Sequence, residues 1–497
     1  MSTEEGEIRG LHYPPPPALQ NYGATAPSTD TASAQAEQPL GRISAKRAYL
    51  AVGVLCYINL INYMDWFIVA GKVMVLFIFC VLLSAPLFGY LGDRYNRKVV
   101  LGLGISLWSG VTLGSSFIRE SFSWMLFVSR GLVGAGTASY STVAPTIIAD
   151  LFEKEKRTLM LSLFYIFIPV GRSVASKVGK GTDRYPSCLF KVTPCMGAIG
   201  LVLLILLVPQ PPRGMAEGNA AESTPASLKD HGERRTWCED VVSLCKNWSF
   251  VWSSLGVTTM SFVTGALGFW VPLFLSRAQQ VHGNVPPCFE EPCNSANSLI
   301  FGGITVVTGL VGVITGAEVA RRCKKINTRA DPIICAVGML TSSPCFYLAI
   351  VLSQKSIPAA YIFIALGEFL LSLNWAIVTD LLLYVVIPKR QSTAVALQIF
   401  VSHLLGDAGS PYLIGIISET IQKRQSDRSY LWDFQSLQYS FIVCTFIGVL
   451  GGGFFLLTAL HIEEDRKKAA PPLKATRATR DIPNSNSRTQ RCVSTAY

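Results

Sequence analysis

The chain has 497 residues, of which 50% are hydrophobic and only 15% are charged, and its formal net charge is +11. A soluble protein of this length needs a charged surface, so this composition indicates that much of the surface faces lipid. The Lys and Arg residues form short clusters between apolar runs and in the C-terminal region. They form no continuous basic stripe, which argues against nucleic acid as a partner.

Twelve apolar segments follow one another along the chain. Each is long enough for a transmembrane helix, which needs roughly 20 residues to cross a bilayer. Only Lys72 separates the first two, although a helical hairpin normally needs a loop of a few residues, so one or both helices are expected to be shortened. The fifth is the weakest, because its second half carries three basic residues. The segments predict an all-α membrane protein with about twelve transmembrane helices at residues 48–71, 73–92, 99–118, 122–149, 158–178, 189–208, 249–275, 298–320, 331–353, 358–387, 393–419 and 436–461.

Basic residues predict on which side of the membrane each connection lies. The connections after the second, fourth, eighth and tenth segments carry two to five Lys or Arg residues each, whereas those after the third, seventh and ninth carry one. Both ends are therefore expected in the cytosol. Cys288 and Cys293 share a loop on the opposite side, where a small disulfide can persist. The predicted parts are a disordered cytosolic tail (1–47), a helical half (48–208), a cytosolic linker (209–248), a second helical half (249–465) and a cytosolic tail (466–497).

The connection after the second segment carries the most specific motif. Residues 89–98 read Gly-Tyr-Leu-Gly-Asp-Arg-Tyr-Asn-Arg-Lys, a pattern that resembles the signature of the major facilitator superfamily. Asp93 can cap or pair with a neighbouring helix end, and Arg94 and Arg97 can help to lock one state of an alternating-access cycle. A degraded copy with Ala320 at the Asp position follows the eighth segment, which indicates two related halves of six helices.

Further stretches resemble the spinster family of lipid transporters over roughly residues 45–465. They are Phe88–Lys98, Arg130–Gly134, Ala138–Thr146 and Ser402–Leu413. The resemblance implies transport of single-chain amphiphilic lipids, either sphingolipids such as sphingosine phosphate or lysophospholipids. It implies no catalysis and no cofactor, and the sequence contains no P-loop, metal cluster or Ser/His/Asp set. The sequence does not decide between the plasma membrane and an endolysosomal membrane.

Two departures from the family pattern concern protons as a coupling partner. Family members commonly have Asp-Arg in the first helix and Gly-Glu-Ala-Ser in the fourth, whereas this chain has Trp66 at the Arg position and Thr137 at the Glu position. A proton-linked cluster thus lacks a carboxylate and an arginine. Facilitated transport without protons is at least as compatible with the sequence.

Charged groups at membrane depth are costly and usually line a pathway. Asp65 and Arg130 each fall roughly 10 Å below the outer surface, given a rise of about 1.5 Å per residue, so they can face each other across a cavity. Two interpretations stay open. The pair is permanent and fixes helix packing, or Arg130 binds an anionic headgroup through bidentate bonds while Asp65 competes for it.

Other polar residues at membrane depth are candidates for substrate contact or coupling. His403 and Asp407 lie one turn apart, and either relay protons or form a structural hydrogen bond. Substrate contact and an inter-helix hydrogen bond remain open for Thr137, Tyr140, Ser141, Glu368 and Asn374. Two other functions also remain: a facilitator of a polar solute such as a sugar or organic anion, and a transport-dead scaffold, which the short first connection favours.

Overall fold

The computed structural model describes residues 43–68, 72–118, 122–180, 186–217, 236–283, 295–424 and 429–469. The loop with Cys288 and Cys293 lies outside these residues, as do nearly all of the first tail and most of the second. The first half consists of α1 (Ala45–Ile68), α2 (Lys72–Arg94), α3 (Arg97–Ser115), α4 (Ser123–Leu151), α5 (Lys154–Lys180) and α6 (Pro186–Leu207).

The second half follows a linker that contains the short helix α7 (Trp237–Cys245). Two of its membrane segments are interrupted. One divides into α11 (Ile357–Ser372) and α12 (Trp375–Val385), and the other into α13 (Gln391–Ser402), the π-helical turn η6 (His403–Asp407) and α14 (Gly409–Lys423). The continuous helices are α8 (Trp248–Val281), α9 (Ser295–Cys323), α10 (Ala330–Leu352) and α15 (Tyr430–Ala469).

The prediction of an all-helical membrane fold is confirmed. Eight segments of the described chain are long and apolar enough to cross a membrane, and the described residues form no strand. The helices α4, α5 and α6 and the interrupted α13–α14 segment complete a set of twelve. The first two helices contain 24 and 23 residues, so each remains long enough to cross despite the short connection.

Local sequence signals explain where several helices begin. Asn96 accepts hydrogen bonds from the backbone of Lys98 (3.0 Å) and caps α3, and Asn247 caps α8 through Phe250 N (3.0 Å). Ser356 caps α11, whose first turn contains Pro358, a position where proline is favoured because its missing N–H has no helical partner there.

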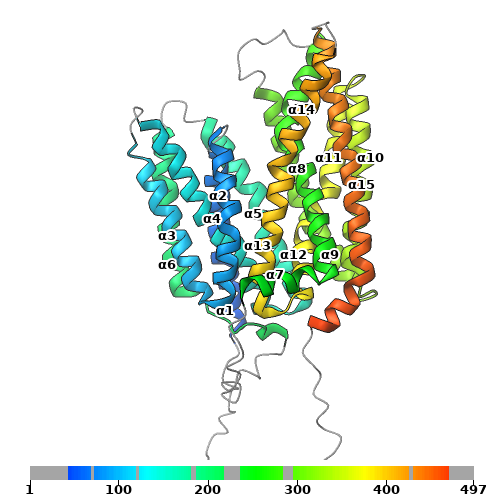
Figure 1. Cartoon of the computed structure of the whole chain (residues 1–497). Helices are drawn as coiled ribbons and strands as arrows, with labels where there is room; N and C mark the ends of the chain where they lie inside the picture. Colours follow the sequence, from blue (N-terminus) through cyan, green and yellow to red (C-terminus); the bar gives the residue numbers. More distant parts are fainter. Residues whose placement is uncertain are drawn as a thin grey trace, which may run out of the picture. The chain divides into compact units, whose positions relative to one another are not determined.

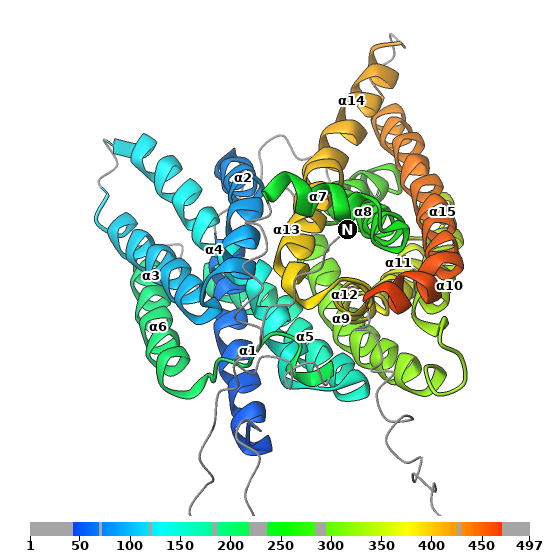
Figure 2. The same cartoon turned by 60° about the horizontal axis from the view of Figure 1, so that its bottom comes forward.

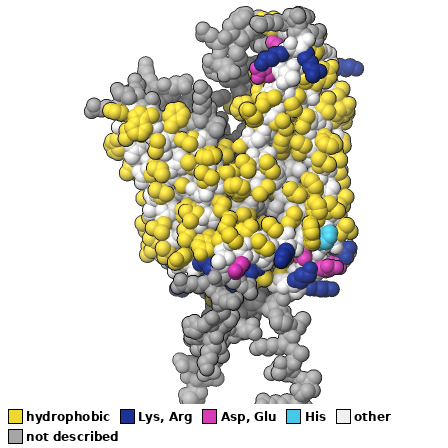
Figure 3. Space-filling model, in the orientation of Figure 1, with side chains coloured by type: hydrophobic (Ala, Val, Ile, Leu, Met, Phe, Trp, Pro, Cys, Tyr) yellow, Lys and Arg dark blue, Asp and Glu magenta, His cyan; other side chains and the backbone are white. Residues whose placement is uncertain are grey.

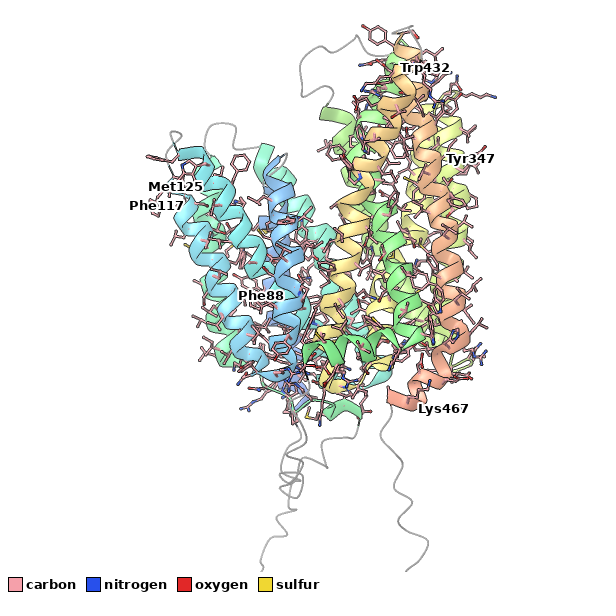
Figure 4. All side chains as sticks on the ribbon, in the orientation of Figure 1. Phe88, Phe117, Met125, Tyr347, Trp432 and Lys467 are labelled. Carbon is pink, nitrogen blue, oxygen red and sulfur yellow. The ribbon has the colours of Figure 1, made fainter. Side chains whose placement is uncertain are left out.

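The surface has the distribution of side chains expected of a membrane protein. On the face shown in Figure 3, apolar side chains cover the flank while Lys, Arg, Asp and Glu gather at the two ends. We call the end at which α1 begins and α15 ends the cytosolic end, after its predicted orientation. Figure 4 places Lys467 at this end, and Phe117, Met125 and Trp432 at the opposite, outer end.

The two halves meet at the cytosolic end. The ribbons come together there and diverge toward the outer end (Figure 1), and the view from below shows α2 beside α13 and α5 beside α9 (Figure 2). The buried apolar cluster of the first half continues into α12 and α13 through Leu381, Val395 and Ala396. The second half has a separate apolar cluster of its own. The described conformation is therefore closed at its cytosolic end.

Candidate functional site

A cavity of about 470 Å³ lies between the two halves. Its walls come from α1, α2, α4 and α5 on one side and from α8, α9 and α11–α14 on the other. The volume falls within the range of about 300–1,000 Å³ that is typical of small-molecule sites. Most lining side chains are apolar or aromatic, and the polar ones include Asn59, Tyr63, Ser141, Tyr165, Thr305, Glu368, Thr379, Gln398, His403 and Asp407.

Two acidic groups line this cavity from the second half. The carboxylate of Glu368 accepts hydrogen bonds from Thr305 (3.1 Å) and Thr308 (3.3 Å) of α9. Asp407 accepts a hydrogen bond from His403 Nδ1 (2.7 Å) within the π-helical turn. Both side chains of the His403–Asp407 pair line the cavity, and π-bulges are frequent at functional sites.

An aromatic group from the first half covers this pair. Trp66 lies 5.9 Å from the His403 ring, is stacked on Tyr63 (5.7 Å) and makes an edge contact with Phe77 (4.8 Å), all between ring centroids. The sequence pointed to Trp66 only as a departure from the family pattern. No sequence signal indicated its contact with His403, because that contact joins segments more than 300 residues apart.

Asp65 and Arg130 form a buried ion pair inside the first half. Arg130 Nη1 lies 3.3 Å from Asp65 Oδ2, and Trp108 Nε1 of α3 donates to the same oxygen (2.8 Å). Both residues are 2% exposed. The expectation that they face each other across the cavity is corrected: neither lines it, because α1, α3 and α4 pack directly around the pair.

Of the other predicted contact residues, some line the cavity and the others are buried between helices. Ser141 and Glu368 line the cavity. Tyr140 is buried and donates to the carbonyl of Leu55 on α1, and Thr137 is buried on the same helix. Asn374 is fully buried at the break between α11 and α12 and does not line the cavity.

The signature motif closes the cytosolic end by capping a helix of the other half. Asp93 accepts hydrogen bonds from the backbone nitrogens of Ser392 (2.9 Å) and Thr393 (2.8 Å) at the start of α13. A carboxylate at a helix N-terminus is favoured by the helix dipole and by the unsatisfied N–H groups there. This bond joins α2 of the first half to α13 of the second half, so it must break when the halves separate at this end.

A second contact between the halves centres on Asp380 of α12, which is fully buried. Its carboxylate accepts from Arg157 Nε (2.6 Å), from Thr158 and from Lys324 Nζ (2.5 Å). Lys324 also pairs with Asp331 (2.9 Å). Burial alone would lower the pKa of Lys324, but the charges of Asp380 and Asp331 outweigh it and raise the pKa above its usual value, which keeps the ammonium charged.

The equivalent motif residues of the first half form a matching pair. Arg97 donates to Asp150 within the first half. In the repeat, Arg97 corresponds to Lys324 and Asp150 corresponds to Asp380. Arg94 instead pairs with Asp240 of the linker helix α7 (3.1 Å), and Arg390 of the second half pairs with the other oxygen of the same carboxylate (2.9 Å). The linker therefore also bridges the two halves at the cytosolic end.

Replacing Gly89 by Val is expected to hold the cytosolic end open. A Cβ at this position lies 2.8 Å from the carbonyl oxygen of Ser392 and closer still to Ala396, so α2 and α13 cannot keep their contact. Spin labels at Tyr95 and Lys389, both exposed at this end, are expected to report longer distances. The control is Gly53→Val, which meets open space. An unchanged distance distribution for the Gly89 variant contradicts the prediction.

Comparison with known proteins agrees with this architecture. The sequence model of the Major Facilitator Superfamily matches residues 61–411. Protein spinster homolog 3 of Mus musculus is 54% identical over 471 residues, and that of Homo sapiens is 52% identical over 470, with 90% of each chain covered in both cases. Protein spinster homolog 1 of Xenopus laevis is 50% identical over 447 residues, which cover 86% of this chain and 83% of the relative.

Solved structures share the fold at low sequence identity. A bacterial homologue of the human lysosomal transporter Spinster, inward-facing and occupied, has a TM-score of 0.56 at 16% identity and covers 85% of this chain and 99% of its own. The proton:xylose symporter XylE has a TM-score of 0.63 at 16% identity, covering 83% of this chain and 96% of its own. The chain is a multi-pass membrane transporter that belongs to the major facilitator superfamily and, within it, to the spinster family.

Proposed function

We propose that the protein carries single-chain amphiphilic lipids, either sphingolipids such as sphingosine phosphate or lysophospholipids, by alternating access of its two halves. The observation that carries this proposal is the mixed character of the central cavity. Aromatic and aliphatic side chains line the same cavity as the polar groups Glu368, His403 and Asp407. They include Phe164, Ile168, Phe301 and Leu371. An apolar wall suits an acyl or sphingoid chain, and the polar groups suit a headgroup.

The His403–Asp407 pair is our candidate for headgroup contact in this conformation. Among the described lining residues, His403 has the one basic side chain. It can therefore donate to a phosphate oxygen, and its bond to Asp407 orients the ring. The same pair is a candidate proton relay, so protons remain a proposed coupling partner.

Replacing His403 by Ala is expected to lower lipid flux by about tenfold or more, because a hydrogen bond to a charged group contributes roughly 1.5–3 kcal/mol. The measurement is uptake of a labelled sphingoid phosphate and a labelled lysophospholipid into liposomes that contain the purified protein, at two pH values. The matched control is His282→Ala, since His282 lies at the end of α8 and does not line the cavity.

The same liposomes distinguish the proposed cargo from the other functions. A sugar and an organic anion are tested beside the lipids. Flux of either one without lipid flux overturns the proposal in favour of a polar-solute facilitator, and the absence of any flux indicates a scaffold. A lipid flux that does not change with pH argues against proton coupling while leaving the lipid cargo intact.

A further inference from the structure

The linker helix α7 has a position and a composition that the transport cycle does not explain. It ends at Cys245, directly before α8 enters the membrane at Trp248, and it lies at the cytosolic end against α8 and α13 (Figures 1 and 2). Thr236 and Glu239 form a capping box at its start, which stabilises so short a helix. α7 is thus a well-defined juxtamembrane helix.

The faces of α7 differ in character. One face carries Asp240, which pairs with Arg94 and Arg390, and Leu244, which is 3% exposed in the core. The opposite face exposes Val242 (52%), whereas Trp237 (39%) is exposed in the first turn, one i, i+7 step before Leu244. An exposed Trp and Val on a helix outside the membrane-spanning segments fit the boundary between water and lipid, where such an amphipathic helix lies in the interface plane.

Both cysteines of α7 lie on the face of Val242. Cys238, Val242 and Cys245 follow at i, i+4 and i+7 and form one stripe, and both thiols are exposed. The helix therefore presents two accessible thiols at the predicted cytosolic leaflet. A thiol on a juxtamembrane amphipathic helix is a typical substrate for reversible S-acylation.

We propose that Cys238 and Cys245 are S-acylation sites and that the acyl chains anchor α7 in the cytosolic leaflet. The cysteine sulfur attacks the carbonyl carbon of a long-chain acyl-CoA and forms a new thioester bond. The bond between that carbon and the sulfur of CoA breaks, and CoA leaves as the thiol with the proton of the cysteine. No oxidation or reduction takes place. Acyl chains on this face leave the opposite face of α7 free to hold Asp240 between Arg94 and Arg390.

The test is metabolic labelling of the full-length protein in cells with an alkynyl palmitate, followed by click detection and treatment with neutral hydroxylamine, which cleaves thioesters. We expect hydroxylamine-sensitive label on the wild type and at least a tenfold loss in Cys238→Ser/Cys245→Ser. The matched control is Cys195→Ser, which removes an exposed cysteine of α6 and is expected to keep the label.

A second measurement does not depend on the variants folding. Trypsin releases residues 236–246 of the wild type as one peptide that contains both thiols, and its mass reports one or two acyl groups. An unlabelled wild type, a double variant that keeps its label, or an unmodified 236–246 peptide each overturns the proposal. A protein partner bound to this face of α7 leaves both thiols unmodified and gives the last of these results.

Discussion

Arg130→Ser is expected to destabilise the protein by about 3–5 kcal/mol, because it leaves the Asp65 carboxylate buried without its cation. Trp108 then remains as a neutral donor to a group that is 2% exposed. We expect a lower thermal unfolding temperature of the purified protein and less protein at its membrane. Arg322→Ser is the control, since the Arg322 side chain is 76% exposed and an exposed ion pair contributes only about 0–1 kcal/mol.

The double variant Asp65→Asn/Arg130→Ser separates the two interpretations of this pair. It removes both charges, keeps an acceptor for Trp108 and is expected to recover most of the lost stability, because the penalty comes from the unpaired charge. If lipid flux recovers with stability, Arg130 fixes helix packing. If flux stays absent while stability returns, Arg130 takes part in headgroup binding in another conformation. An unchanged unfolding temperature in Arg130→Ser alone contradicts the buried ion pair.

Much of the fold could be predicted because lipid restricts the choices of the chain. Every backbone polar group in a bilayer must be satisfied within the segment, so apolar runs of sufficient length form helices. The interruptions could not be predicted from hydropathy. The break after Ser372 lies where the backbone of Leu373 packs tightly against Gly316, and that contact depends on how α9 and α11 meet. The linker helix α7 is too short and polar to register as a membrane segment.

The depth of the candidate residues in the membrane could be predicted from the sequence, but the direction in which their side chains point could not. The helical rise placed Asp65 and Arg130 at a similar level, and the structure pairs them. Which way they face depends on the rotation of α1 and α4, and Trp108 of α3 contacts Asp65 and fixes that rotation. His403 and Asp407 follow from their spacing, whereas the contact of Trp66 with His403 requires both halves to be assembled.

The repeat predicted which charged residues matter at the cytosolic end, but not their partners. Arg157 and Arg390 occupy related positions, since they follow the fourth and the tenth membrane segments. The structure gives them different partners, since Arg157 bonds Asp380 across the interface and Arg390 bonds Asp240 of the linker. The asymmetry arises because a single linker joins the halves and supplies a carboxylate on one side only.

Asp380→Asn is expected to open the cytosolic end. Asp380 is the shared anion of Arg157 from the first half and Lys324 from the second, and its own side chain is 0% exposed. Without its charge, the Arg157 side chain, which is 4% exposed, loses this partner, and Lys324 keeps Asp331 as its carboxylate partner. Breaking a buried pair costs about 3–5 kcal/mol, which corresponds to a shift of more than roughly a hundredfold between conformations.

The measurement is again the distance between spin labels at Tyr95 and Lys389, together with the unfolding temperature. We expect longer distances and a cytosolic end that remains open without substrate. The unfolding temperature of Asp380→Asn is expected to fall less than that of Arg130→Ser. In Asp380→Asn the halves can separate and expose Arg157 and Lys324 to water, whereas in Arg130→Ser the unpaired Asp65 stays buried inside one half. Glu318→Gln is the matched control, since both ion pairs of Glu318, with Arg321 and Arg322, stay within the same helix. Arg157→Gln combined with Asp380→Asn tests the pair itself: if the two residues act through one bond, the double variant opens the cytosolic end no further than Asp380→Asn does. Distances that match the wild type in Asp380→Asn mean that the Asp93 cap and the linker carboxylate of Asp240 are sufficient to hold the halves together.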